Sequence, residues 1–175
     1  MRVFLFATHL PGGIKELHGF MPLADIDTNA YEQFSPGGYT NLLDAMYSAI
    51  GSTNTYAKQL ADNDFMSNGI NVIITDGDDN DSKLTAGQVK KEIERGIKGE
   101  FIESDIVLLV GINAAQYKNQ LESLQTSVGI NKYIDAGDVT PGRLAKLADF
   151  VSQSVSSQSH ALGTGGPSQQ IAPTI

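Results

Sequence analysis

The chain has 175 residues, a length typical of one domain, and 41% of them are hydrophobic, which is enough for a sizeable core. Twenty acidic residues against twelve basic ones give a net charge of −8 without a Lys/Arg cluster, so we expect no nucleic-acid partner. No apolar run approaches the roughly 18 residues of a membrane span, and we expect no membrane partner. The absence of cysteine excludes disulfides, thiolate metal sites and cysteine nucleophiles.

The first expected element is a strand over Arg2–Ala7, a short run that is almost entirely apolar. Because this start lacks the basic leader and longer apolar stretch of an export signal, we expect a cytoplasmic protein. A turn signal follows at residues 11–13, Pro-Gly-Gly. The next run, Leu17–Ile26, is therefore expected to return antiparallel beside the first strand.

Helix and strand patterns alternate along the rest of the chain. Apolar periodicity predicts helices over Asn41–Gly51, Thr85–Gly96, Asn113–Val128 and Pro141–Ser154, with strands between them at Asn71–Thr75, Asp105–Val110 and Lys132–Ile134. Thr85 and Gln88 have the spacing of a capping box, and Thr140 before Pro141 marks a further helix start.

This alternation predicts an α/β fold. We expect a Rossmann-like three-layer sandwich, with a mainly parallel sheet, one antiparallel edge strand, and helices on both faces. After Ser154 the composition shifts to Ser, Gln, Gly, Thr and Pro, without Asp, Glu, Lys or Arg. One domain is therefore expected over residues 1–158, and a flexible tail over residues 159–175.

An acidic loop follows the strand Asn71–Thr75, with four carboxylates among residues 76–81. In open parallel sheets, ligands bind at the carboxyl ends of strands. Carboxylates this close either face solvent or surround a hard cation such as Mg²⁺, Mn²⁺ or Ca²⁺. Asp76 and Asp78 also have the Asp-x-Asp spacing found in haloacid-dehalogenase-like phosphatases, so this strand end resembles the active-site motif of that family. The resemblance would make Asp76 the nucleophile.

A second segment, Ser35–Met46, ends a Gly-rich loop and opens a helix just after Thr40. Together with Ile-Ile-Thr-Asp-Gly at residues 73–77, this segment resembles the von Willebrand factor A (vWA) family, and the likeness extends from Arg2 to about Ser154. In that family the two segments belong to a metal-ion-dependent adhesion site. The resemblance implies that Thr40 and Asp76 hold a divalent cation, which captures an acidic group on a protein partner.

Other residues of the two segments are expected to support this site. Asp44 would cap its own helix or hold Thr40 in place, and Asp78 would assist the cation. The glycines beside the two ligands are Gly38 and Gly77. The aromatic residues Phe34 and Tyr39 would either form a rim for a partner or pack beneath the loop.

The family's Asp-x-Ser-x-Ser motif, which supplies the remaining ligands, is absent from this sequence. The resemblance makes Arg2–Ala7 the family's second strand, so the central first strand is missing between it and Asn71–Thr75. Unpaired backbone groups at such a place are costly. An upstream segment supplies the strand, another chain or a second copy inserts one, or the two flanking strands pair directly.

We therefore expect a protein-interaction module rather than an enzyme. It would bind a partner through or beside the partial adhesion site, with Mg²⁺ (or Mn²⁺ or Ca²⁺) held weakly or not at all by this chain alone. The partner would donate an acidic residue or the missing strand, and a homodimer is one form of this. The alternative is a Mg²⁺-dependent, phosphatase-like hydrolase that uses Asp76 and Asp78.

Overall fold

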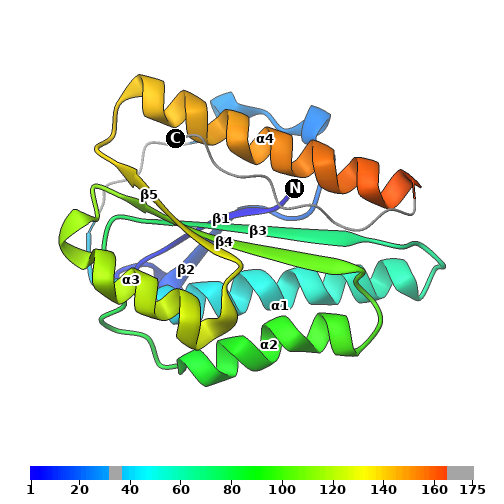
Figure 1. The fold of residues 1–175 in the computed structure, drawn as a ribbon, viewed down its shortest axis with the longest axis horizontal. Helices are drawn as coiled ribbons and strands as arrows, with labels where there is room; N and C mark the ends of the chain where they lie inside the picture. Colours follow the sequence, from blue (N-terminus) through cyan, green and yellow to red (C-terminus); the bar gives the residue numbers. More distant parts are fainter. Residues whose placement is uncertain (32–36, 165–175) are drawn as a thin grey trace.

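The computed structural model describes residues 1–31 and 37–164, which form an α/β protein with two sheets (Figure 1). The first sheet is an antiparallel hairpin, and the second is a parallel sheet of three strands. The hairpin consists of β1 (Val3–Phe6) and β2 (Ile14–His18). The parallel sheet has the order β3 (Asn68–Thr75), β4 (Ser104–Ile112) and β5 (Lys132–Gly137).

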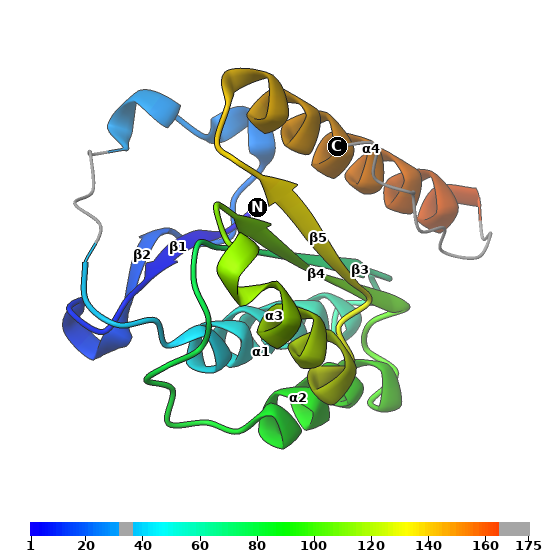
Figure 2. The ribbon, with the colours of Figure 1, turned by 60° about the vertical axis from the view of Figure 1, so that its left-hand side comes forward.

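Helices cover both faces of the parallel sheet (Figures 1 and 2). One face carries α1 (Leu42–Ala61), α2 (Ala86–Lys98) and α3 (Lys118–Leu124), and the other carries α4 (Pro141–Thr164). Short 3₁₀ turns lie at Pro11–Gly13, Leu23–Asp25, Thr28–Ala30 and Ala115–Tyr117, and a π turn at Gln125–Gly129. In the described part of the chain, no helix is both long and apolar enough to cross a membrane.

Two apolar clusters hold the helices on the parallel sheet. The larger lies beneath α1, α2 and α3 and includes Met46, Ile50 and Leu109, all fully buried, with Phe6 of β1 packed at its border. The smaller joins α4 to the other face of β4 and β5. Residues 105–111 of β4 are all buried, because this strand lies in the middle of the sheet with helices above and below it.

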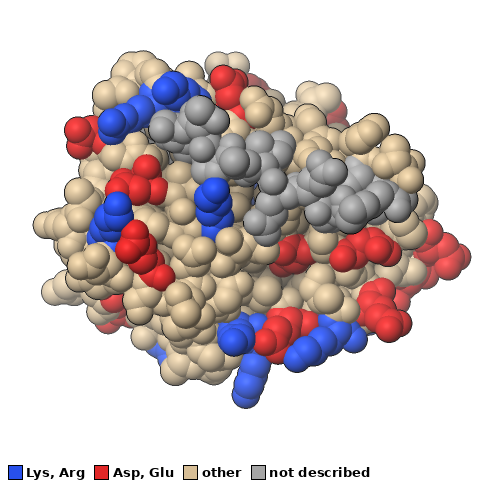
Figure 3. All heavy atoms as spheres, in the orientation of Figure 1, with Lys and Arg blue, Asp and Glu red and all other residues tan. Residues whose placement is uncertain are grey.

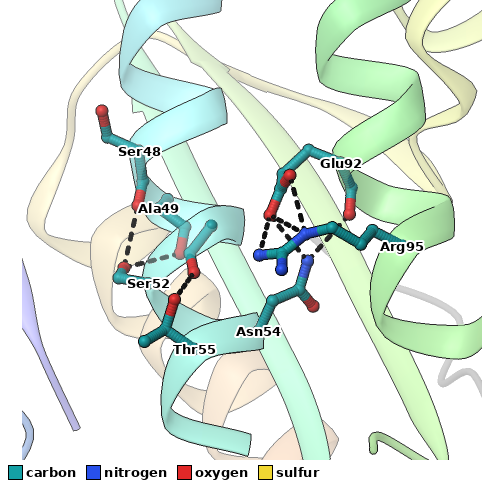
Figure 4. Close-up of polar contacts among 8 residues, drawn as sticks. Ser48, Ala49, Ser52, Asn54, Thr55, Glu92 and Arg95 are labelled. Carbon is teal, nitrogen blue, oxygen red and sulfur yellow. Dashed lines mark hydrogen bonds and ion pairs between the residues drawn. The ribbon is translucent and has the colours of Figure 1, made fainter. Parts of the chain in front are cut away.

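A polar cluster joins α1 to α2 inside the helical layer (Figure 4). Asn54 of α1 donates from Nδ2 to the backbone oxygen of Glu92 at 2.8 Å and to its Oε1 at 3.0 Å. Arg95 pairs with the same Glu92 carboxylate at 2.6 Å. A Cβ on Gly96 would lie 2.3 Å from Asn54 Oδ1, so the glycine allows the two helices to approach this closely.

Charged side chains are unevenly distributed over the surface, and acidic ones gather at the end where β3 and β4 begin (Figure 3).

The expected strands are confirmed, apart from the second one. The hairpin is antiparallel as predicted, but its second strand is Ile14–His18 rather than Leu17–Ile26, and part of the expected strand is a 3₁₀ turn. The chain reverses early because Gly12 and Gly13 both take positive φ, 69° and 79°. The returning strand therefore starts directly after the glycines.

The helices differ from expectation mainly at their ends. The capping box at Thr85 and the helix start at Pro141 are confirmed. The helix expected from Asn113 begins only at Lys118, because Asn113 has φ 53° and its side chain accepts the N–H of Val139. The last helix continues to Thr164, so residues 159–164, which were expected in the tail, are helical. The rest of that tail lies outside the described residues.

The hairpin and the parallel sheet are not joined into one sheet, in contrast to our expectation. Figure 2 shows β1 and β2 on the β3 side of the parallel sheet, but no hydrogen bond between described residues pairs β1 with β3. Direct pairing of these two flanking strands is therefore wrong. β1 and β3 each keep one edge without a backbone partner in the part of the chain described, and we call these two the open edges.

Candidate binding site at the carboxyl ends of the strands

The segment Tyr39–Thr40 connects the carboxyl ends of β1 and β3. Thr8, just after β1, donates its N–H to the backbone oxygen of Tyr39 at 3.0 Å, and its Oγ1 accepts the Tyr39 N–H at 2.8 Å. The Thr40 N–H donates to Asn80 Oδ1 at 2.7 Å, and the Thr40 oxygen accepts the N–H groups of Asn80 and Asp81. Both strands therefore end at the same short segment.

The Thr40 hydroxyl lies beside the turn that contains Asp76. A Cβ placed on Gly77 would be 3.5 Å from Thr40 Oγ1. Thr75 holds this turn, because its Oγ1 donates to the Gly77 oxygen at 2.9 Å and accepts the Gly77 N–H at 3.2 Å. Asp76 is exposed, and among the described residues its carboxylate has no hydrogen-bond partner or ion pair. The fold thus places the Thr40 hydroxyl beside Gly77, the residue that follows Asp76.

Gly38 and Tyr39 lie next to the end of β1. Gly38 has φ 78°, and a Cβ on it would be 3.0 Å from three atoms of Thr8 and His9. A glycine is therefore required for the loop to pass this close to β1, rather than for contact with Thr40. The side chain of Tyr39 is 67% exposed, which fits a rim position and not packing beneath the loop. Phe34, the other expected rim residue, lies outside the described residues.

Asp79 of the acidic loop, together with Ser82 just after it, contacts the start of α1. Asp79 Oδ1 accepts the Leu43 N–H at 3.2 Å, and Ser82 Oγ accepts the Asp44 N–H at 3.2 Å. These N–H groups have no partner within the helix, and carboxylates near a helix start also interact favourably with its dipole. The N-cap residue Asn41 does not supply this cap, because its side-chain amide donates to the Gly13 oxygen at 3.1 Å. Sequence reasoning missed this role, since no local pattern links partners this far apart in the chain.

Asp44 does not take either of its expected roles, and Asp78 makes a local contact within the turn. The Asp44 carboxylate accepts the N–H of Leu84 at 2.9 Å and that of Lys83 at 3.1 Å, so it ties α1 to the segment before α2 and does not hold Thr40. Asp78 Oδ1 accepts the N–H of the next residue, Asp79, at 2.8 Å. Asp76 and Asp81 are then the acidic residues of the loop whose carboxylates have no hydrogen bond within the described chain.

The residues at this site offer a divalent cation two oxygen ligands. Within the described residues, no group of three or more His, Asp or Glu side chains is placed to hold a metal ion. The Thr40 hydroxyl and the Asp76 carboxylate are hard oxygen donors, and Mg²⁺ often keeps several waters with only one or two carboxylates. This donor set fits a weakly held Mg²⁺.

Comparison with protein-family models, with curated proteins and with solved structures gave no match for this chain.

Proposed function

We propose that this protein is a vWA-like protein-interaction module, which binds its partner at the carboxyl ends of the strands, through or beside a cation. The observation that carries the proposal is the position of the Thr40 hydroxyl beside the exposed turn of Asp76. One neutral hydroxyl and one carboxylate would leave a bound Mg²⁺ with half of its positive charge. That charge would attract an acidic side chain of the partner, and the exposed ring of Tyr39 would contribute apolar contact area.

The open edges support a second part of the same proposal, in which the partner adds a strand between β1 and β3. Unpaired strand edges bind extended segments through main-chain hydrogen bonds. Ile74, on the same face of β3 as Val72, is 47% exposed although its strand neighbours Ile73 and Thr75 are buried. An added segment would cover this side chain. A completed sheet would have the three-layer, Rossmann-like arrangement expected from the sequence.

Titration with Mg²⁺, followed by NMR at residues 76–81 and by calorimetry, tests the cation site. We expect weak binding, with a dissociation constant near the millimolar range. Asp76→Asn and Thr40→Val should each weaken it by about tenfold, since each removes one of two protein ligands. Asp81→Asn is the matched control, because it removes the same charge from an exposed position of the same loop.

Two outcomes would contradict this cation site. Equal weakening by Asp81→Asn and Asp76→Asn would indicate general attraction to an acidic loop. Tight stoichiometric binding that survives Asp76→Asn would place the metal elsewhere.

One assay distinguishes the phosphatase-like hydrolase from the interaction module. A generic phosphate ester with Mg²⁺ should be hydrolysed by the wild type and not by Asp76→Ala if Asp76 is a nucleophile. The interaction module predicts no turnover above that of Asp76→Ala. One oxygen of Asp78 accepts the Asp79 N–H, which gives this carboxylate a role in the turn.

A further inference from the structure

A second surface lies at the opposite end of the parallel sheet, where β3 and β4 begin. The loops that enter these two strands run side by side, joined by a hydrogen bond from the Glu103 N–H to the Ser67 oxygen at 2.9 Å. They enclose a pocket of about 210 Å³. This pocket is separated from Thr40 and Asp76 by the length of β3, so its role does not depend on the site proposed above.

The pocket is bordered by large apolar side chains that face solvent. Phe65 and Met66, adjacent in the chain, are 63% and 61% exposed. Phe101 lines the pocket from the other loop, and the buried Ile102 contributes to its wall. Single exposed apolar residues are common, but aromatic residues and Met gathered around a hollow are typical of protein interfaces.

Three carboxylates surround this apolar hollow. Asp64, Glu100 and Glu103 line the pocket, are exposed, and form no ion pair with any described residue. Asp64 and Glu100 also have positive φ, 64° and 57°, which is uncommon for residues with a side chain. Figure 3 shows acidic side chains gathered at this end of the molecule.

The basic residues near this end are already paired with other carboxylates. Arg95 pairs with Glu92 at 2.6 Å, and two further pairs, Lys58 with Asp62 and Lys98 with Glu94, lie at 2.8 Å and 2.6 Å. Arg95 also lies over the ring of Phe101, 5.9 Å from its centroid, but it is paired with Glu92, so no described basic side chain forms an ion pair with the three rim carboxylates. A partner that brings positive charge would complement them.

The size of the pocket limits what it holds. Sites for cofactors and other small molecules usually measure about 300–1,000 Å³, so this pocket suits one side chain instead. We propose that it docks a basic segment of a partner protein, which inserts an apolar side chain between Phe65 and Phe101 and places Lys or Arg on either side, against the rim carboxylates. The pocket would be a second contact surface, at the far end of the sheet from the cation site.

A synthetic peptide of alternating Lys and Ala around one central Phe tests this proposal. NMR titration should shift the amide signals of residues 61–67 and 99–104, and the effect should weaken as salt is added. A peptide with Ala in place of Phe, and one with Glu in place of every Lys, should leave these signals unchanged. Replacing the rim carboxylates together, with Asp64→Asn, Glu100→Gln and Glu103→Gln, should weaken binding by about tenfold or more.

A second triple variant, with the same net charge as the rim variant, serves as the matched control. Asp25→Asn, Asp138→Asn and Asp149→Asn together remove the same three charges from exposed positions away from the pocket and should leave binding unchanged. Phe65→Ala, at an exposed position that does not threaten folding, should weaken it. Equal weakening by both triple variants, or shifts confined to the acidic loop of residues 76–81, would overturn the proposal. If the amide signals at the pocket broaden with rising protein concentration in the absence of peptide, the occupant of the pocket is a second copy of this chain and not a basic segment of another protein.

Discussion

Asp105 is the charged residue whose surroundings most favour the neutral form. It lies near the start of β4 and is 8% exposed. Its Oδ1 accepts Asn71 Nδ2 at 2.8 Å, while its Oδ2 is buried without a partner in the described structure. Asn71 in turn accepts the Thr53 hydroxyl, so the chain of contacts joins α1, β3 and β4. Burial raises the pKa of Asp105 to about 6, against the opposing effect of the Asn71 hydrogen bond.

This raised pKa predicts a pH-dependent stability. The folded protein binds the Asp105 proton more tightly than the unfolded chain does. The stability contributed by this proton is therefore complete below the unfolded pKa of about 4, and it is lost as pH rises through the folded pKa of about 6. Asp105→Asn should remove this loss. Between pH 4 and pH 7.5, the free energy of unfolding of the variant should gain roughly 2 kcal/mol relative to the wild type. Urea unfolding at the two pH values measures the change.

The comparison across pH separates ionisation from packing. If the new amide at position 105 lacks an acceptor, it lowers stability equally at both pH values. The ionisation of Asp105 is therefore measured by how much the stability difference between variant and wild type changes from pH 4 to pH 7.5. Asp138→Asn, at an exposed position after β5, is the control and should show no such change. The same difference between variant and wild type at pH 4 and pH 7.5 would contradict the raised pKa.

At the scale of elements, the packing of α1 on α2 depends on glycine. Gly96→Ala would place a Cβ 2.3 Å from Asn54 Oδ1 and 2.8 Å from Ile102 Cγ2, and should lower the free energy of unfolding by about 1–3 kcal/mol. Gly87→Ala, in the same helix but with nothing within 4 Å of its Cβ position, should raise it by about 0.5 kcal/mol through helix propensity. Chemical unfolding of both variants measures this contrast, and equal effects of the two changes would contradict the close packing.

The ends of the helices show which features the sequence could predict and which it could not. Helix starts at Thr85 and Pro141 were predictable because a cap is a pattern of neighbouring residues. The end of α1 was not, because its last turns carry few apolar residues and extend to Ala61 by continuing the backbone hydrogen bonds. The likeness of two short motifs predicted that Thr40 and Asp76 share a site, and the structure places the Thr40 hydroxyl beside Gly77, which follows Asp76. The capping of α1 by Asp79 and Ser82 was not predictable, because contacts across the chain leave no local pattern.

At the scale of the whole molecule, the two sheets differ in how well they are held. Residues 105–111 of β4 are buried, whereas no residue of β1 or β2 is. A two-stranded hairpin is marginally stable by itself. It is attached to the rest through the Thr8–Tyr39 hydrogen bonds, the hydrogen bond from Asn41 to the Gly13 oxygen, and the packing of Phe6 on the larger cluster. Just after β2, the ring of Phe20 stacks on that of Tyr56 in α1, with 4.4 Å between the ring centroids. The hairpin should therefore open without unfolding the parallel sheet.

Amide hydrogen exchange tests this difference. The hairpin amides should exchange through local opening at a free energy lower than that of β4 by at least about 2 kcal/mol. In β3, amides that face β4 should be protected, while alternate amides on the open edge should exchange fast. Residues 108–111 of β4, paired on both sides, serve as the internal reference. Uniform protection along β3 would mean that its open edge is already covered.

The concentration dependence of that exchange identifies what covers the open edges. If a second copy of this chain inserts a strand, the fast amides of β3 should become protected as protein concentration rises, and those of β1 should follow, because one added strand bonds both edges at once. If the strand comes from a different protein, the fast amides should stay fast at every concentration of this chain. Protection of β3 without protection of β1 would contradict insertion between them, and would indicate a segment that pairs with β3 alone.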